Sequence, residues 1–373
     1  MRIGIDARPL VGRRAGIGHY LNGVLRALAP LTDHEVILYA HRPIDAPPLG
    51  HHWRMNVRPG PRGTGPLWLQ LFGPSLIAHD RLDVFWGAHF LLPVALGSDI
   101  PAAVTVYDLV PVLFPQTMEW PNYAVLRLFL RPSLRRAQRV MTISQAVADD
   151  LQRLMGVPPG RIAVIPPGVR DGFVPLDPEE ARRHVRDRWG LPGPYLLTVG
   201  TIEPRKNLPI LLRAYGRLPT AFRARHPLVV VGASGWNTRE VSALGAPFVE
   251  EGTLRFVGYV PDAEMPWLFA AASLFVYPSL YEGFGIPVLE AMASGLPIVA
   301  SDIPVLREVA EGAAVYAPPG AAASWTSAIE RVLADPALQA AMRDAGIKRA
   351  ASYSFGRAAR QVLAVLEQLG ARR

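Results

Sequence analysis

Two carboxylates in one segment have the type and spacing to bind a ligand that carries both phosphate and hydroxyl groups. Glu282 and Glu290 have seven residues between them, and Gly283 and Gly285 follow the first. The apolar run at residues 274–277 predicts a buried strand, so Glu282 lies where a strand leads into the amino end of a helix. Such an end offers backbone N–H groups and a positive dipole to an anion. With one carboxylate in the loop and one inside the helix, the segment suits a ligand that carries both phosphate and hydroxyl groups better than it suits a bare phosphate.

A pair of cations is the second chemical feature. Arg205 and Lys206 follow the predicted strand at residues 195–199 through a short loop. Their side chains can therefore converge where parallel strands end. Two positive charges there would stabilise the negative charge that develops on a departing diphosphate. A solvated loop end is the alternative interpretation of this pair.

These residues must be positioned by a chain in which strands and helices alternate from end to end. The length of 373 residues, half of them hydrophobic, exceeds a single typical core, so two domains are expected. The alternation predicts βαβ units around parallel sheets. A linker rich in Pro and Gly, residues 166–175, separates the halves. Residues 44–66 are expected to form a surface loop. The predicted strands are residues 2–6, 35–39, 83–86, 102–107, 139–143 and 161–165, then 195–199, 228–231, 254–257, 274–277, 298–300 and 313–316.

The amino-acid composition and the length of the apolar runs exclude several kinds of site and of protein. The chain has no cysteine, which excludes disulfides, Cys-based zinc sites and thiol nucleophiles and agrees with a reducing, cytoplasmic setting. A net charge of +8 fits an anionic substrate, an anionic membrane or an arginine-rich composition without a special partner. No nucleic-acid module accompanies the charge, so nucleic-acid binding is not expected. Arg2 interrupts the first apolar run, which favours a strand over a signal peptide. No run approaches the roughly 18 apolar residues of a membrane-spanning helix.

The ordered motifs resemble a known family. The pattern P-S-x-Y-E-G-F-G-x-P-x-L-E-A-M-A-x-G around Glu282, the segments at residues 199–207 and 256–260, and the glycines at residues 16–20 are similar to those of retaining nucleotide-sugar glycosyltransferases of family 4. The resemblance spans nearly the whole chain. It implies the α/β GT-B fold, in which two doubly wound Rossmann-like domains face a central cleft. Residues 1–170 would form the acceptor-side domain and residues 171–354 the donor-binding domain, with the closing helix at residues 355–373 crossing back to the first.

The resemblance also implies roles for residues of the second domain. Glu282 would contact the transferred sugar and Glu290 the ribose, while Lys206 and Arg205 would contact the diphosphate. Some family members have a phosphate-binding arginine directly after the strand glycine, where this chain has Thr201, so Arg205 would carry more of the phosphate contact. The remaining donor-binding residues implied are Gly200, Thr201, Gly258, Tyr259, Val260, Gly283, Phe284 and Gly285.

In the first domain the resemblance points to strand ends and a glycine pair. Gly16 and Gly18 would face the diphosphate, although a tight turn alone would also explain them and Leu21 breaks a full dinucleotide-binding fingerprint. Many relatives have His-Asp-Leu where this chain has Tyr107 and Asp108. Tyr107 cannot act as an imidazole base, yet its hydroxyl could bind a sugar, so both residues are candidates for the catalytic site. His89, at another strand end, is expected on the acceptor side, with a surface histidine as the alternative.

The expected reaction is transfer of a hexose, with retention, by front-face attack or through a covalent intermediate. The phrase V-G-T-x-E-P-R-K-N is most similar to bacterial mannosyltransferases of surface-polysaccharide assembly, so GDP-mannose is the first donor, followed by UDP-glucose and dTDP-rhamnose. No metal is expected, because no Asp-x-Asp motif is present and the basic residues would take the cation's role. No separate cofactor is implied. A GT-B-like epimerase and a non-catalytic nucleotide-sugar-binding protein are the alternatives.

The acceptor would be a glycan or a lipid-linked saccharide. Arginines at positions 127, 131, 135, 136 and 139 alternate with apolar residues around Pro132. This pattern is compatible with a basic helix on the inner face of an anionic membrane. An amphipathic core helix whose arginines are solvated is the alternative, and the pattern slightly favours it.

Overall fold

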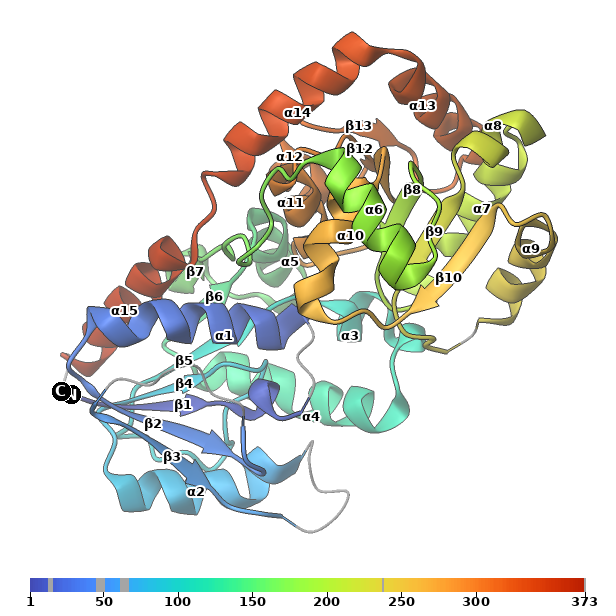
Figure 1. Ribbon diagram of the computed structural model, residues 1–373. Coiled ribbons are helices and arrows are strands. Elements are labelled where there is room, and N and C mark those ends of the chain that lie inside the picture. The colour runs from blue at the N-terminus through green and yellow to red at the C-terminus, as the bar shows by residue number, and fades with distance from the viewer. Residues whose placement is uncertain (13–15, 45–50, 61–66, 237, 372–373) are drawn as a thin grey trace. The chain divides into compact units, whose positions relative to one another are not determined.

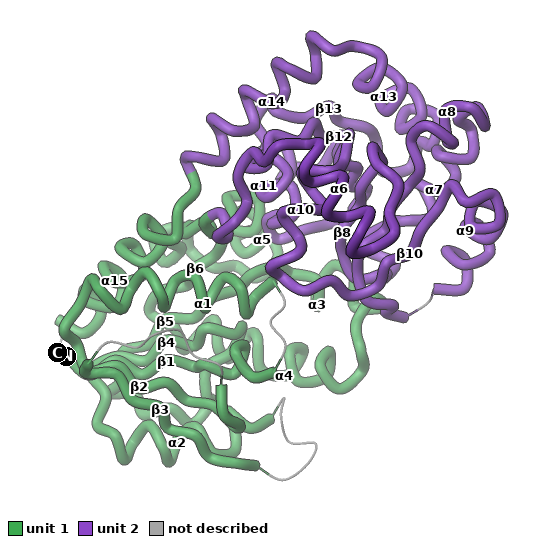
Figure 2. The backbone as a smooth tube through the Cα atoms, viewed as in Figure 1, with its two compact units in different colours: residues 1–168, 353–373 green, residues 169–352 purple. Residues whose placement is uncertain are grey.

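The chain forms two compact α/β units (Figure 2). The computed structural model describes residues 1–12, 16–44, 51–60, 67–236 and 238–371. Met1–Gly168 and Tyr353–Arg373 make up unit 1, and Val169–Ser352 makes up unit 2. Each sheet is parallel and covered by helices (Figure 1).

Unit 1 is built on a seven-stranded parallel sheet with the order β3-β2-β1-β4-β5-β6-β7. The strands are β1 (Arg2–Asp6), β2 (Glu35–Ala40), β3 (Trp53–Val57), β4 (Val84–Gly87), β5 (Ala102–Val106), β6 (Arg139–Thr142) and β7 (Ile162–Val164). The helices are α1 (Gly16–Leu28), α2 (Trp68–Asp80), α3 (Val110–Leu113), α4 (Trp120–Arg136), α5 (Gln145–Met155) and α15 (Phe355–Gly370). The central strands are buried along nearly their whole length, as expected when helices cover both faces of a parallel sheet.

One strand of unit 1 contradicts the sequence prediction. Residues 44–66 were expected to form a surface loop, but Trp53–Val57 forms β3, which pairs in parallel with β2. Only its first residue is buried. An edge strand has one neighbour and a largely solvated face, so it lacks the continuous apolar run that marks the inner strands. Residues 45–50 and 61–66 of the same segment lie outside the described residues.

The carboxy-terminal helix packs back on unit 1, as predicted. Helix α15 lies along α1 (Figure 1), and its apolar stripe buries Val362, Leu366 and Leu369. A methyl group on Gly23 of α1 would lie 2.5 Å from the Phe355 ring. The glycine therefore allows the two helices to approach closely.

Unit 2 repeats the architecture with a six-stranded parallel sheet of order β10-β9-β8-β11-β12-β13. Its strands are β8 (Leu196–Val199), β9 (Leu228–Val231), β10 (Leu254–Gly258), β11 (Leu274–Tyr277), β12 (Ile298–Ser301) and β13 (Val315–Ala317). Its helices are α6 (Pro178–Trp189), α7 (Leu208–Gly216), α8 (Thr220–Arg225), α9 (Arg239–Glu250), α10 (Met265–Ala271), α11 (Ile286–Ala293), α12 (Pro304–Ala310), α13 (Ala322–Ala334) and α14 (Pro336–Ala350). All the predicted strands of both halves are present, with ends that differ by at most two residues.

Both sheets change direction next to their first strand. In unit 1 the chain runs from β1 outward to β3 and then returns to place β4 on the other side of β1. In unit 2 it runs from β8 to β10 and returns to place β11 beside β8. Ligands of doubly wound sheets bind at the carboxyl ends of the strands at such switch points. None of the helices in the described ranges has the length and hydropathy to cross a bilayer.

Candidate functional site

The cations and the first carboxylate predicted from the sequence meet at the switch point of unit 2. Arg205 and Lys206 belong to a single helical turn, Pro204–Lys206, shortly after β8. Glu282 lies in the loop after β11, the strand that pairs with β8 in parallel. Parallel pairing places both loops at the same edge of the sheet. Residues that are 76 positions apart in sequence are therefore in contact.

The loop after β8 begins and ends with a residue of positive φ, Gly200 and Asn207. Gly200 has a φ of 151°, and a methyl group on the neighbouring Gly232 would lie 2.0 Å from the Gly200 carbonyl oxygen. This close approach lets β8 and β9 end side by side. Asn207 has a φ of 52° and ends the turn that carries Lys206. Its amide donates to the carbonyls of Pro278 and Pro319, at 3.1 and 2.9 Å, which fixes the turn against the loop after β11.

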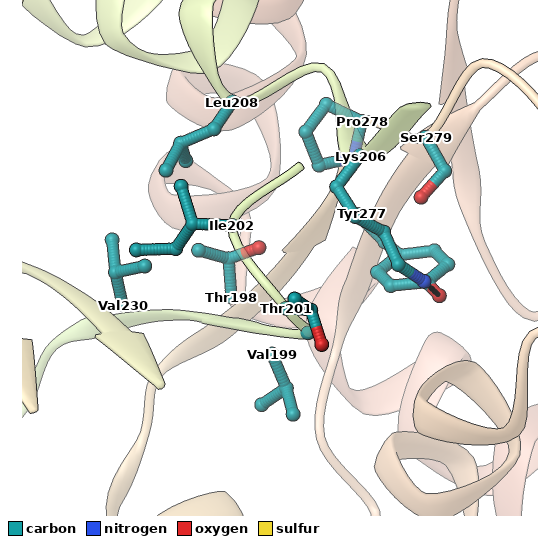
Figure 3. A pocket seen from close by; sticks show the side chains of 11 residues that line it. Thr198, Val199, Thr201, Ile202, Lys206, Leu208, Val230, Tyr277, Pro278 and Ser279 are labelled. Carbon is teal, nitrogen blue, oxygen red and sulfur yellow. Dashed lines mark hydrogen bonds between the residues drawn. The ribbon is translucent and has the colours of Figure 1, made fainter. Parts of the chain in front are cut away.

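Glu282 is the centre of a buried hydrogen-bond network. Its Oε1 accepts from Lys206 Nζ at 2.6 Å and from the Tyr277 hydroxyl at 2.9 Å. Lys206 Nζ also donates to that hydroxyl, at 2.9 Å, and Figure 3 shows its side chain reaching across to Tyr277. Glu282 is only 8 % exposed. The carboxylate is thus held rigidly, because it has charge-assisted hydrogen bonds within a small volume.

Arg205 completes the network from the other side. Its Nη1 lies 3.0 Å from Glu282 Oε2 and donates to the Tyr281 carbonyl at 2.8 Å. Its Nη2 pairs with Glu203. Two cations therefore face two carboxylates within this network. A diphosphate that entered would have to share or replace the carboxylates.

Burial and the partner's opposite charge shift the pKa values of Glu282 and Lys206 in opposite directions. Burial raises the pKa of Glu282, but Lys206 and Arg205 outweigh it and lower the pKa from 4.5 to about 2. Burial, aided by Arg205, lowers the pKa of Lys206, against the opposing effect of Glu282. Glu282 is therefore ionised across the physiological range, and its negative charge favours the protonated form of the Lys206 amine against the effect of burial.

Glu290 lies inside α11 and forms a separate buried ion pair. It is 2 % exposed, and its Oε1 accepts from Arg170 Nε at 2.5 Å. Arg170 also pairs with Asp262 at 2.9 Å and lies over the Phe173 ring. Burial raises the pKa of Glu290, although Arg170 lowers it. A ribose at Glu290 would therefore bind beside a carboxylate that already has one cationic partner.

The glycines after Glu282 shape the start of α11. Gly285 caps this helix with a φ of 93°, and a methyl group there would lie 2.7 Å from a Leu306 methyl carbon. Phe284 is buried, and Gly283 is partly buried. The loop therefore turns sharply from Glu282 into the amino end of the helix, the arrangement that favours an anion.

The other predicted donor residues of unit 2 lie along the same edge of the sheet. Gly200 and the exposed Thr201 follow β8. Gly258 ends β10 and accepts a hydrogen bond from the Gly232 N–H at 2.9 Å. Tyr259 is 51 % exposed, whereas Val260 is buried. Contact of any of these residues with a base or a phosphate stays a prediction.

The predicted residues of unit 1 lie at the carboxyl edge of its own sheet. Gly16 and Gly18 form the first turn of α1, after residues 13–15, which lie outside the described residues. Tyr107 follows β5 but is 3 % exposed, and its hydroxyl donates to the Ala88 carbonyl at 2.8 Å. Asp108 Oδ1 accepts from the Val110 N–H at 3.0 Å. Both side chains thus have structural partners, and a direct role for either in the reaction stays a prediction.

Two residues of the site in unit 2 were missed in the sequence. Tyr277 ends a strand that was predicted as plain core, and Arg170 lies in the segment predicted as a linker. A polar hydroxyl as the last residue of a buried strand was a signal for Tyr277. Arg170 had no comparable local signal, because its partner Glu290 is 120 residues away.

The space behind Lys206 is too small for a donor molecule. A cavity of about 20 Å³ lies among Thr198, Lys206, Leu208 and Tyr277 (Figure 3), which is room for roughly one water molecule. Across the described ranges, no three His, Asp or Glu side chains gather as metal ligands.

Comparison with known proteins agrees with this geometry. Residues 182–349 match the family "Glycosyl transferases group 1", and residues 14–173 match "Glycosyltransferase Family 4". An Escherichia coli protein named O-antigen chain mannosyltransferase B is 33 % identical over 272 residues, which cover 73 % of this chain and 71 % of the relative.

Solved structures share the fold over the full length. Sucrose-phosphate synthase of Thermosynechococcus elongatus superimposes with a TM-score of 0.78 at 22 % identity, covering 100 % of both chains. Anabaena HepE, solved in complex with UDP-glucose, does so with a TM-score of 0.76 at 20 % identity, covering 99 % of this chain and 100 % of the other.

Proposed function

Since the chain belongs to glycosyltransferase family 4 and has the GT-B fold, we propose that it transfers a hexose, with retention and without a metal ion, from a nucleoside-diphosphate donor. Mannose from GDP-mannose is the first donor we propose. The observation that supports this function best is the contact of Lys206 and Arg205 with Glu282 at the switch point of unit 2. It combines a cationic contact for the leaving diphosphate with a carboxylate for the sugar.

Each charged group has a distinct role in this proposal. Lys206 and Arg205 stabilise the negative charge that develops on the diphosphate as the glycosidic bond breaks. Glu282 binds hydroxyls of the transferred sugar, while Glu290 binds the ribose hydroxyls. The backbone N–H groups at the start of α11 hold oxygens of the donor.

Donor binding rearranges the network of Glu282. In this structure its carboxylate pairs with Lys206 and Arg205, the two cations that we assign to the diphosphate. Tyr277 gives it a third hydrogen bond. When the diphosphate binds, the cations turn to the phosphate and the carboxylate becomes available to the sugar. Glu282 therefore keeps the two cations neutralised until the donor arrives.

The mannose donor is proposed because of the Escherichia coli relative, whose name describes a mannosyltransferase of O-antigen chains. The acceptor that fits such a reaction is a growing glycan or a lipid-linked saccharide. We therefore place the enzyme in the cytoplasm, where nucleotide-sugars are available.

A surface on α4 supports peripheral contact with a membrane. Trp120 is 73 % exposed and Leu128 is 64 % exposed, and the exposed Arg127, Arg131 and Arg135 share this helix with them. Only Leu130, Ser133 and Leu134 of α4 are buried, so it is largely a surface helix. Exposed Trp and Leu beside arginines suit an anionic bilayer surface. Sedimentation with vesicles should show binding to phosphatidylglycerol-containing but not neutral vesicles, and the double variant W120A/L128A should lose it.

Incubation with a panel of nucleotide-sugars tests the function. GDP-mannose, UDP-glucose and dTDP-rhamnose are each incubated with the protein without an acceptor, and release of free nucleoside diphosphate is measured. We expect slow release from GDP-mannose that Lys206→Ala lowers by about two orders of magnitude. Lys348→Ala is the matched control, because Lys348 is exposed on α14. If the panel yields no release and no binding, the proposal is wrong, whereas faster release from another member changes only the donor.

A further inference from the structure

A strained turn after β4 presents His89 at the carboxyl edge of the unit 1 sheet. Phe90 has a φ of 61°, a left-handed conformation that is rare for a bulky aromatic residue. Gly87, which begins the turn, has no space for a side chain, because a methyl group would lie 2.4 Å from the Leu91 carbonyl oxygen. Backbone strain of this kind persists only where the surroundings hold it, and it clusters at functional sites.

Strand β5 holds this turn in place. The Phe90 N–H donates to the Thr105 carbonyl at 3.0 Å, and the Tyr107 hydroxyl donates to the Ala88 carbonyl at 2.8 Å. The rings of Phe90 and Tyr107 pack edge to face, with their centroids 5.5 Å apart. The backbone on both sides of His89 is therefore held in place by β5.

The turn lies at the switch point between β1 and β4, where a doubly wound sheet binds its ligand. Beside it, at the end of β1, Asp6 is fully buried and accepts two hydrogen bonds from the Arg8 guanidinium, each at 2.8 Å. Arg8 is 8 % exposed.

Among the described residues, the two charged side chains that act on His89 are Arg8 and Asp6, which have opposite signs. Burial and the positive charge of Arg8 lower the pKa of His89 to about 4, with Asp6 opposing the shift. Burial, Tyr20 and Asp6 raise the pKa of Tyr107 well above its ordinary value. At neutral pH the imidazole and the phenol are uncharged, and Asp6 neutralises Arg8. These groups together carry no net charge.

We propose that His89 binds the acceptor through a hydroxyl of an uncharged sugar, with Tyr107 as the residue that positions it. This inference rests on the proposed function, because it assumes that unit 1 receives the acceptor. A neutral imidazole both donates and accepts a hydrogen bond, which suits a hydroxyl. A phosphorylated acceptor would find no uncompensated positive charge among these residues.

Two rates measured side by side test the role of His89. With the donor that the panel selects, the first rate is nucleoside-diphosphate release without acceptor. The second is glycoside formation on methyl α-mannoside, methyl α-glucoside and methyl α-galactoside, and on their 6-phosphates. His89→Ala should lower transfer to the best neutral acceptor by about tenfold or more, the loss of one well-placed hydrogen bond, and leave release within about twofold. His89→Gln should restore part of the transfer. His79→Ala, an exposed histidine on α2, should change neither rate.

Tyr107→Phe tests the positioning role. It keeps the ring contact with Phe90 and removes the hydrogen bond to Ala88. We expect the KM for the neutral acceptor to rise roughly three- to tenfold, with donor release unchanged. A purely structural role would lower thermal stability and leave the acceptor KM as it was.

Several outcomes would overturn the inference. Transfer by His89→Ala at the unmodified rate would overturn it, and so would an equal loss of donor release and transfer in both His89 variants. Faster transfer to the 6-phosphates than to their neutral parents would also overturn it, as would the absence of transfer to every neutral acceptor. Absence of donor release in the unmodified protein is a different result, because it contradicts the proposed function itself.

Discussion

Replacing Glu282 by glutamine should separate stability, nucleotide binding and turnover in one variant. Glutamine keeps the size of the side chain but removes its negative charge. Lys206 and Arg205 would then lie together without the Glu282 charge, while Glu203 would keep its pairing with Arg205. The network predicts that the variant is less stable but binds free nucleoside diphosphate at least as tightly.

The expected loss of stability follows from the pKa of Glu282. A fall from 4.5 to about 2 corresponds to about 3 kcal/mol of stabilisation of the ionised carboxylate. The lowered pKa of Lys206 shows that burial of the ammonium offsets part of this gain. We therefore expect Glu282→Gln to lower the free energy of unfolding by about 1–3 kcal/mol. For a unit of this size that is a fall of roughly several degrees in Tm.

The stabilisation that Glu282 gives to the folded state should decrease as the pH falls. A carboxylate with a lowered pKa in the folded state stabilises the protein fully above its unfolded pKa of 4.5, and this contribution is lost as the pH falls toward 2. The stability gap between the unmodified protein and Glu282→Gln should therefore narrow as the pH falls from 7 to 4, by about 1 kcal/mol.

The affinity for free nucleoside diphosphate, unlike the stability, should not fall in Glu282→Gln. Free nucleoside diphosphate has no sugar, and in the unmodified protein it competes with Glu282 for the two cations. Glu282→Gln should thus bind GDP or UDP as tightly as the unmodified protein or up to about tenfold more tightly, while transfer falls by about a hundredfold.

Calorimetric titration, thermal unfolding and the release assay measure the three effects. Glu240→Gln is the matched control, because Glu240 pairs with Arg213 on the surface with both side chains more than half exposed, and such pairs contribute less than about 1 kcal/mol. Unchanged stability together with a tenfold loss of nucleotide affinity would refute the assignment of Glu282 as the group that neutralises the cations in the free enzyme.

Three further outcomes are expected. Lys206→Ala should lower turnover by about two orders of magnitude and weaken nucleoside-diphosphate binding, and equal rates and affinities would remove Lys206 from the site. Activity should persist in excess EDTA, whereas a loss that magnesium or manganese restores would show that a metal takes part. Glu290→Ala should weaken both the intact donor and the free nucleotide by about ten- to a hundredfold, measured by titration with circular dichroism as the check on folding. A loss confined to the intact donor would move Glu290 from the ribose to the sugar.

The sequence was sufficient for those features that depend on local patterns. Short apolar runs between helical stretches predicted the inner strands, because a strand covered on both faces must be apolar along its length. Gly285 before Ile286 and Glu282 after a strand predicted the loop into α11, because glycine and helix starts have local conformational requirements. The apolar stripe of the last helix was likewise visible. Strand β3 was missed because an edge strand has no such pattern.

The partners of the charged side chains were decided by the tertiary structure. Lys206 and Glu282 meet only because β11 returns to the side of β8, and Arg170 reaches Glu290 across 120 residues. Likewise, nothing local to Tyr107 indicates that its hydroxyl holds the Ala88 carbonyl. A sequence pattern records how each segment folds, but the order of strands in the sheet determines which segments become neighbours. The charges, the pKa values and the candidate site depend on those neighbours.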